Sequence, residues 1–146
     1  MSRDEPDLIL EFIRRMWAVD HELQRVSKRM VERIGLTAPQ RLAVRFIGRH
    51  SGVTLGELAK LLHMHAGTVT GIVRRLEELG LVVQTRSTED TRRRHLTLTV
   101  KGRQIDRRQK GTVEAAVRRA ASTVTSDELA TAARVMDALA THLAAE

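Results

Sequence analysis

Residues 92–94 are three consecutive arginines, the longest run of cations in the sequence. Their guanidinium groups suit contacts with phosphate oxygens, which arginine meets with two parallel N–H donors. Residues 96–99 alternate between apolar and polar side chains, as a strand does, and residues 81–86 alternate in the same way. The turn-forming residues 87–91 separate the two segments. The sequence therefore predicts a β-hairpin with a cationic tip, suited to a polyanion.

Two short helices are predicted immediately before this hairpin. Thr54 and Glu57 have the spacing of a capping box, in which each side chain accepts a hydrogen bond from the other residue's backbone N–H. A turn is expected at residues 63–65, and a second helix over residues 66–79 ends before Gly80. These elements form a helix-turn-helix, and the cationic hairpin beside it is typical of a winged helix that binds duplex DNA.

The second helix of the pair has its apolar residues on one side, so its other side is free to face DNA. Arg74 is the best candidate for reading sequence, because arginine pairs with guanine through two N–H groups. Thr68 and Thr70 could contact phosphates or a thymine methyl group. Gly67 and Gly71 would let the backbone approach base edges; alternatively, Gly67 lies in a loose first turn and Gly71 is tolerated at the surface.

Other polar residues around the predicted site have two interpretations each. Arg75 points toward the hairpin and is expected either to touch DNA or to pair with a carboxylate of the protein. Arg86, Arg93 and Arg94 are expected to bind phosphates, and the alternative is a solvated hairpin face. His65 lies at the start of the second helix and is a further candidate for DNA contact.

The outer elements are predicted to be long amphipathic helices. One covers residues 6–34 and is closed by Gly35, another covers residues 100–121, and Thr125 opens the last. Each shows more apolar surface than a small monomer can bury. We therefore expect these helices to pair between two subunits, as two-fold DNA sites favour two-fold proteins.

A further helix, capped by Thr37 and carrying Leu42, Phe46 and Ile47 on its apolar side, is predicted before the helix-turn-helix. The expected fold class is mainly α with a small β-hairpin wing (α+β). The expected division is a winged helix-turn-helix DNA-binding domain over residues 37–99 and a helical dimerisation region over residues 1–36 and 100–146.

Composition supports these expectations. The 146 residues carry a formal net charge of +7, and residues 74–110 alone hold eleven Lys or Arg against five Asp or Glu, a net charge of +6. With no cysteine, the chain has no disulfide and no thiolate zinc site. Two Phe, one Trp and no Tyr leave little for stacking on unpaired bases, which favours duplex DNA over RNA or single strands.

Other classes of protein are disfavoured. No apolar run reaches the roughly 20 residues that cross a bilayer, so a cytoplasmic protein is expected. The sequence contains no glycine-rich phosphate loop, HExxH pair or GxSxG motif, so we expect no enzyme and no cofactor.

Four strings follow one another in this chain: residues 58–62 (LAKLL), residues 68–82 (TVTGIVRRLEELGLV), residues 90–92 (DTR) and residues 98–102 (LTVKG). Together with the order of helices and strands, these strings resemble the signatures of the MarR (multiple antibiotic resistance regulator) family of bacterial and archaeal transcription factors. The resemblance covers nearly the whole chain.

The resemblance implies a regulator of transcription, most often a repressor, that binds a pseudo-palindromic operator as a homodimer. It implies that the second helix of the helix-turn-helix enters the major groove while Arg92 enters the minor groove, oriented by Asp90. Gly71 departs from the polar or charged residue that the family often carries there. The residues expected at the DNA interface are His65, Gly67, Thr68, Thr70, Arg74, Arg75, Arg86, Asp90, Arg92, Arg93 and Arg94.

The resemblance also implies a small phenolic or anionic effector, bound in a crevice between the dimerisation helices and the winged helix. Trp17 and His21, one turn apart on the first helix, could line it; alternatively, Trp17 belongs to the core or an interface and His21 to the surface.

Three alternatives stay open. The chain could be a metal-responsive regulator that uses His63 and His65, although no cysteine or acidic cluster adjoins them. It could be an architectural protein that binds DNA without regard to sequence. It could also use its winged helix only for contacts with proteins, which the cationic hairpin disfavours.

Overall fold

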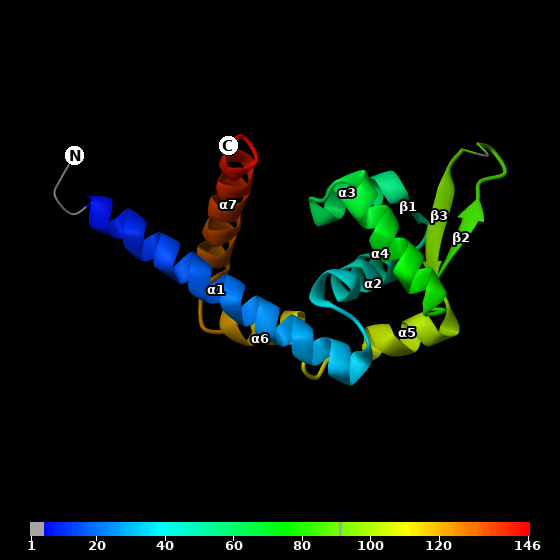
Figure 1. The fold of residues 1–146 in the computed structure, drawn as a ribbon, viewed down its shortest axis with the longest axis horizontal. Coiled ribbons are helices and arrows are strands. Elements are labelled where there is room, and N and C mark those ends of the chain that lie inside the picture. The colour runs from blue at the N-terminus through cyan, green and yellow to red at the C-terminus, as the bar shows by residue number, and fades with distance from the viewer. Residues whose placement is uncertain (1–4, 91) are drawn as a thin grey trace.

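The computed structural model describes residues 5–90 and 92–146. Figure 1 shows a winged helix on one side and, on the other, long helices that extend away from it. The described elements, in chain order, are α1 (Glu5–Ile34), α2 (Ala38–Arg49), β1 (Val53–Thr54), α3 (Leu55–Leu62), α4 (Ala66–Glu78), β2 (Val82–Arg86), β3 (Arg94–Leu98), α5 (Val100–Arg107), α6 (Val113–Ala121) and α7 (Ser126–Leu143).

The predicted helix ends are confirmed where a local signal sets them. Gly35 follows α1 with a φ of 76°, a left-handed conformation that glycine adopts without a steric cost. Thr37, Thr54 and Thr125 each cap a helix with a complete capping box.

The predicted hairpin forms, with an additional strand that the sequence did not indicate. β2 pairs with β3 in antiparallel register, with Val82 opposite Leu98 and Arg86 opposite Arg94. The third strand, β1, pairs on the other side of β3 and places Val53 opposite Leu96. The connecting loop is longer than the predicted turn, because β3 begins at Arg94. Thr91 lies outside the described residues, as do residues 1–4 of the predicted dimerisation region.

The core of the winged helix lies between α2, α3, α4 and the sheet. Leu58, Val69, Leu76 and Leu96 are fully buried in it. On α2 the expected apolar side is only partly right: Ile47 is buried and Phe46 is half-buried, whereas Leu42 is 43% exposed. The buried face of α2 instead consists of Arg41, Ala43, Val44 and Ile47.

The prediction of one continuous helix over residues 100–121 is wrong, because α5 ends at Arg107 and α6 begins at Val113. Between them Gly111 has a φ of 79°, and the Thr112 side chain accepts a hydrogen bond from the backbone N–H of Ala115, which starts a new helix.

A buried arginine explains where the first of these helices stops. The Arg41 side chain is 1% exposed and donates hydrogen bonds to the carbonyl oxygens of Ile105, Asp106 and Arg108. These carbonyls lie at the end of α5, where a helix leaves its last acceptors without partners. Because α2 supplies the donor, the break depends on tertiary contacts, which periodicity along residues 100–121 does not reveal.

The junction between the winged helix and α5 requires Gly102. A Cβ atom there would lie 2.1 Å from the carbonyl oxygen of Leu81, far inside van der Waals contact. This glycine therefore lets α5 pack directly against the backbone that precedes β2.

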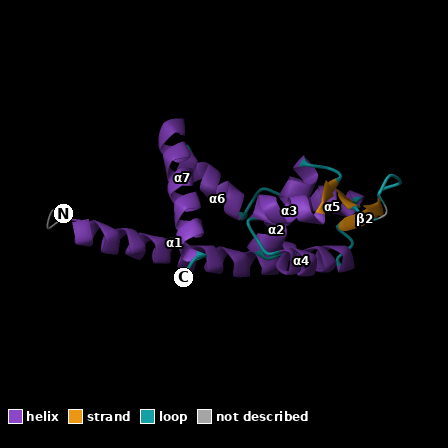
Figure 2. Ribbon diagram, turned by 90° about the horizontal axis from the view of Figure 1, so that it is seen from above, coloured by secondary structure: helices purple, strands orange, loops and turns teal. Residues whose placement is uncertain are grey.

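α1 and α7 leave apolar side chains uncovered in the single chain, as predicted. Figures 1 and 2 show α1 extending away from the winged helix and α7 rising across the line of α1, apart from the winged helix. The large apolar residues exposed on these two helices are Leu8, Ile9, Leu10, Phe12, Ile13, Trp17, Val19, Leu23, Val31, Leu129, Val135, Met136 and Leu143. Within the described residues, no helix combines the length and apolar character needed to cross a membrane.

Candidate nucleic-acid interface

The outer face of α4 carries the residues predicted to read DNA. Val69, Val73 and Leu76 turn into the core, while Gly67, Thr68, Thr70, Gly71 and Arg74 are all exposed. A Cβ atom at Gly67 or Gly71 would meet no atom within 4 Å. Packing within the chain therefore does not require either glycine.

The polar side chains on this face differ in whether they already have a hydrogen-bond or ion-pair partner within the chain. The Thr70 hydroxyl donates to the carbonyl oxygen of Ala66 at 2.8 Å, which leaves its methyl group and lone pairs for other contacts. Arg75 forms an exposed ion pair with Glu78 at 3.2 Å, as one of its two interpretations anticipated. Arg74 is exposed and has no such partner within the described residues.

The tip of the hairpin holds a local pair between Asp90 and Arg92. The Asp90 Oδ1 atom accepts the backbone N–H of Arg92 at 3.0 Å and lies 3.6 Å from its Nε atom. The Arg92 side chain is 93% exposed. The structure thus brings together the aspartate and the arginine that the resemblance paired, and leaves the guanidinium facing solvent.

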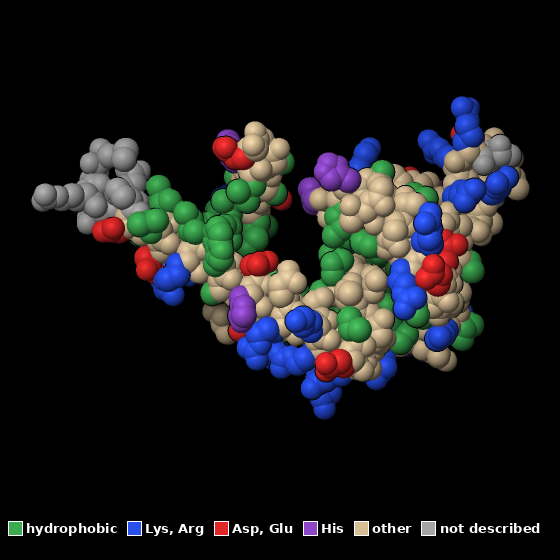
Figure 3. Space-filling model, in the orientation of Figure 1, with side chains coloured by type: hydrophobic (Ala, Val, Ile, Leu, Met, Phe, Trp, Pro, Cys, Tyr) green, Lys and Arg blue, Asp and Glu red, His purple; other side chains and the backbone are tan. Residues whose placement is uncertain are grey.

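The other cations of the hairpin gather nearby. Arg86 and Arg94 lie opposite each other in the β2–β3 register, and Arg93 is also exposed. Figure 3 shows basic side chains at the hairpin end of the molecule and a second group along its lower edge. A hollow of about 560 Å³ separates the hairpin from the start of α3 and is lined by Lys60 and by the arginines at 92–94. The arginines of the hairpin and Lys60 of α3 therefore face one hollow, which Glu57 also lines.

Several contacts hold the hairpin against α4. The Gln84 side chain donates to Glu77, which links β2 to α4. At the other end of the hairpin, the Thr99 hydroxyl donates to the carbonyl oxygen of Gly80 at 2.6 Å, and the Lys101 ammonium to that of Leu79 at 3.1 Å. These contacts join the strands and the base of the hairpin to α4.

The turn of the helix-turn-helix places its histidines at the surface. His63 ends α3 with a φ of 50°, a left-handed conformation, and His65 precedes α4 without a side-chain capping bond. Among residues 5–90 and 92–146, no group of three or more His, Cys, Asp or Glu side chains gathers as a metal site would require.

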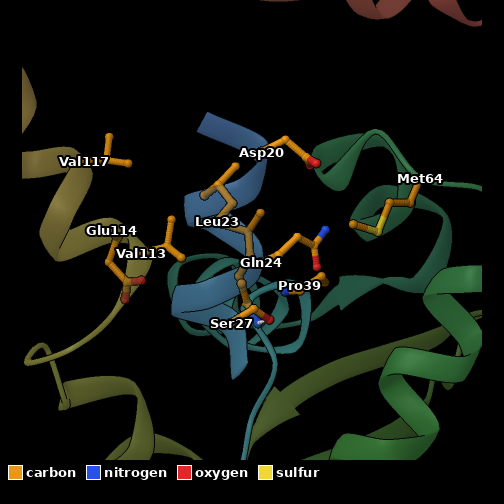
Figure 4. Close-up of a pocket in the computed structure, with 11 residues that line it drawn as sticks. Asp20, Leu23, Gln24, Ser27, Pro39, Met64, Val113, Glu114 and Val117 are labelled. Atoms are coloured by element: carbon orange, nitrogen blue, oxygen red, sulfur yellow. Dashed lines mark hydrogen bonds between the residues drawn. The ribbon is translucent and has the colours of Figure 1, made fainter. Parts of the chain in front are cut away.

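A pocket of about 500 Å³ lies between the long helices and the winged helix, where the resemblance placed a crevice. Figure 4 shows its wall, formed by residues of α1, α2 and α6 and by Met64 from the turn before α4. Trp17 and His21 are both exposed on α1 and are not among its lining residues, so their role in binding an effector stays a prediction.

Comparisons with known proteins agree with this geometry. A MarR family model matches residues 34–93. The chain is 30% identical over 87 residues to the organic hydroperoxide resistance transcriptional regulator of Bacillus subtilis (strain 168), covering 60% of this chain and 59% of that protein. It is also 30% identical over 103 residues to the HTH-type transcriptional regulator TtmR of Methylorubrum extorquens (strain PA1), covering 70% of this chain and 53% of that one. The match therefore spans between half and three fifths of these two relatives.

Solved structures extend the likeness to the whole fold. The crystal structure of Streptococcus pneumoniae FabT in complex with DNA superposes with a TM-score of 0.67 at 26% identity, covering 94% of this chain and 96% of FabT. That similarity includes the long helices outside the segment matched by the family model. The chain thus resembles MarR family proteins: residues 34–93 match the family model, and the winged helix-turn-helix flanked by long helices has the fold of FabT.

Proposed function

We propose that this protein regulates transcription by binding duplex DNA at specific sequences as a homodimer, most simply as a repressor. The observation that carries the proposal is that Arg74, on the outer face of α4, and the arginines of the hairpin are all exposed on one winged helix. In this arrangement α4 enters the major groove and Arg92 reaches the adjacent minor groove. FabT, whose fold this chain shares, was crystallised in complex with DNA.

The proposed contacts divide into two kinds. Arg74, Thr68, Thr70 and His65 meet base edges or nearby phosphates, and Gly67 and Gly71 let the backbone come close. The remaining contacts hold the protein on the sugar-phosphate backbone or in the minor groove, and these residues are Arg75, Arg86, Asp90, Arg92, Arg93 and Arg94. Asp90 acts through Arg92, which it holds at the tip of the hairpin.

The homodimer is supported by the apolar side chains that α1 and α7 expose. Trp17 is 64% exposed, Leu8 69% and Met136 63%, on helices that project away from the winged helix. A second copy would cover these faces and would place two reading surfaces on one duplex. The proposed domains follow: residues 37–99 bind DNA, and residues 1–36 and 100–146 pair the subunits.

The experiment that tests this function is selection of bound duplexes from a random pool. We expect a palindromic motif with half-sites about 10 base pairs apart, because a two-fold dimer places its two reading helices about one helical turn apart. Recovery of unrelated sequences with equal affinity would instead support an architectural protein, and failure to recover any duplex would contradict the proposal.

A further inference from the structure

A second basic surface lies where α1 ends beside the connection between α5 and α6. Arg33, Arg108 and Lys110 line a hollow of about 480 Å³ there, together with Ile34 and Gln109. We call this surface the basic hollow. The Arg33 side chain lies close to the connection, because a Cβ atom built at Gly111 would be 3.2 Å from its Nη1 atom. The fold thus brings together cations from two segments that are far apart in the sequence.

The positive charge of the basic hollow is not neutralised within the chain. Residues 28–34 and 107–113 carry six Lys or Arg against a single carboxylate, Glu32. The cations that line the hollow are exposed and form no ion pair with any other described residue; they are Arg33, Arg108 and Lys110. An anion that binds here would therefore be attracted by several cations at once.

The carboxylates that flank the connection between α5 and α6 already have partners. Asp106 Oδ1 lies 2.7 Å from Nη1 of Arg45, and Glu114 Oε1 lies 2.7 Å from Nη2 of Arg41. Both partners belong to α2, so these pairs hold the junction together and leave the cations of the connection available to a ligand.

The basic hollow is separate from the reading surface, by which we mean the outer face of α4 and the arginines of the hairpin. None of its described lining residues belongs to α4 or to the hairpin. In Figure 1 the tip of the hairpin and α3 lie at the top, whereas the end of α1 and the connection between α5 and α6 lie at the bottom. Figure 3 shows basic side chains along this lower edge as well. Binding of an operator by the reading surface therefore does not account for these cations.

Pairing of subunits does not account for them either. Ile34 is the one apolar residue among the described residues that line the hollow. The buried centres of interfaces between proteins are depleted of charged residues, whereas interfaces with DNA are more polar and much more positively charged. Arginine also meets phosphate with two parallel N–H donors, and Arg29, one turn before Arg33 on α1, extends the row of cations. The backbone of duplex DNA fits this surface better than a protein does.

We propose that the basic hollow binds the sugar-phosphate backbone of a second DNA duplex without regard to sequence. It is the weaker of the two sites, because it offers fewer cations than the reading surface and no helix that enters a groove. A dimer on its operator would then hold another segment of DNA as well. This consequence rests on the proposed function, whereas binding of a duplex by the basic hollow does not.

Fluorescence anisotropy with a random duplex of about 12 base pairs, at about 50 mM salt, tests the proposal. The starting protein is a full-chain variant whose reading surface has lost its charge, through Arg74→Gln, Arg86→Gln, Arg92→Gln, Arg93→Gln and Arg94→Gln. We expect this variant still to bind the duplex. The further substitutions Arg33→Gln, Arg108→Gln and Lys110→Gln should lower its affinity at least tenfold. They should also reduce the slope of log affinity against log salt concentration by about 3, because three phosphate contacts are lost.

The matched control removes the same charge from another part of α1, through Arg14→Gln, Arg15→Gln and Arg25→Gln in the same starting variant. Each of these arginines pairs with a glutamate of its own helix, so the affinity should stay within about threefold. Circular dichroism should show an unchanged fold for every variant, because all the substituted side chains are exposed.

The proposal is overturned if the starting variant binds no duplex, or if the substitutions in the basic hollow weaken binding no more than the control does. Tighter binding of poly-L-glutamate than of the duplex, with the same sensitivity to these substitutions, would assign the hollow to an acidic protein instead. Because the duplex has a random sequence, a chain without any preferred operator would contradict the proposed function and leave this result unaffected.

Discussion

Arg41 and Glu114 form an ion pair with Nη2 and Oε1 2.7 Å apart, which joins α2 of the winged helix to α6 of the outer helices. The same guanidinium donates to three carbonyl oxygens at the end of α5. A second pair, between Arg45 Nη1 and Asp106 Oδ1 at 2.7 Å, supports the same junction. Arg41, together with Arg45, therefore links the end of α5 and the start of α6 to α2 of the winged helix.

Arg41→Ala should destabilise the protein strongly. The substitution leaves Glu114 without its main partner and the carbonyl oxygen of Arg108 without the donor it has in the structure, in a site where Arg41 is 1% exposed. Removing one member of a buried pair typically costs about 3–5 kcal/mol of unfolding free energy. Because Glu114 is partly exposed, we expect about 3 kcal/mol, measured by urea denaturation at fixed protein concentration.

Arg25→Ala is the control for this prediction. Arg25 pairs with Glu22 on α1, but both side chains are more than half exposed, so the loss should stay below about 0.5 kcal/mol. Similar losses for the two variants would show that Arg41 does not hold the junction.

The break that Arg41 creates shows what the sequence could predict and what it could not. The caps at Thr37, Thr54 and Thr125 depend on residues within one helical turn, so the sequence predicts these helix starts, and at Thr54 it also predicts the complete capping box. The strand β1 exists because Val53 meets Leu96, and α5 ends because α2 supplies a guanidinium. Both features depend on residues more than 40 positions away, which local periodicity does not register.

The same distinction, between features set by nearby residues and features set by residues distant in the sequence, applies to the candidate site. The exposed face of α4 follows from helical periodicity, whereas the Asp90–Arg92 pair was expected only from the family resemblance. The pocket is formed by residues of α1, α2, α6 and the turn before α4, which only the folded chain brings together. Its lining by Asp20 and Glu114 therefore had no signal in the sequence pattern.

Gly102→Ala should weaken the packing of α5 against the winged helix. The added Cβ atom would clash with the carbonyl oxygen of Leu81. Either the backbone at Leu81 or α5 must therefore shift to make room for the methyl group. Overpacking of this kind costs about 1–3 kcal/mol, so we expect a midpoint of thermal unfolding lower by several degrees. An unchanged midpoint would show that α5 shifts without cost.

Gly71→Ala should have opposite effects on stability and on DNA binding. Nothing lies within 4 Å of the added Cβ atom, and alanine is favoured over glycine in a helix by about 1 kcal/mol. If α4 brings its backbone close to base edges at this point, the same methyl group would clash with DNA. We expect higher thermal stability together with weaker binding of the selected operator; unchanged binding would place Gly71 away from the DNA.

Arg92→Ala should weaken binding to the operator and to a random duplex by similar factors. The Arg92 side chain is 93% exposed at the tip of the hairpin, and the proposed function places it against the sugar-phosphate backbone in the minor groove. Because one cation is lost, the slope of log affinity against log salt concentration should fall by about 1. Gel-shift titrations at several salt concentrations measure both quantities, and an unchanged slope would remove Arg92 from the interface.

Arg74→Ala should instead lower the preference for the operator. A two-point contact between arginine and guanine contributes about 1–3 kcal/mol of discrimination against the wrong base, while its share of random-duplex binding is small. The ratio of the two affinities should therefore fall by roughly tenfold or more, and re-selection with the variant should relax one base position in each half-site. Arg25→Ala, on α1 and paired with Glu22, should leave the ratio unchanged. If Arg74→Ala instead lowers the affinity for the operator and for a random duplex by the same factor, as expected for Arg92→Ala, then Arg74 contacts the backbone of DNA rather than its bases. Sequence preference would then have to come from the shape of the duplex.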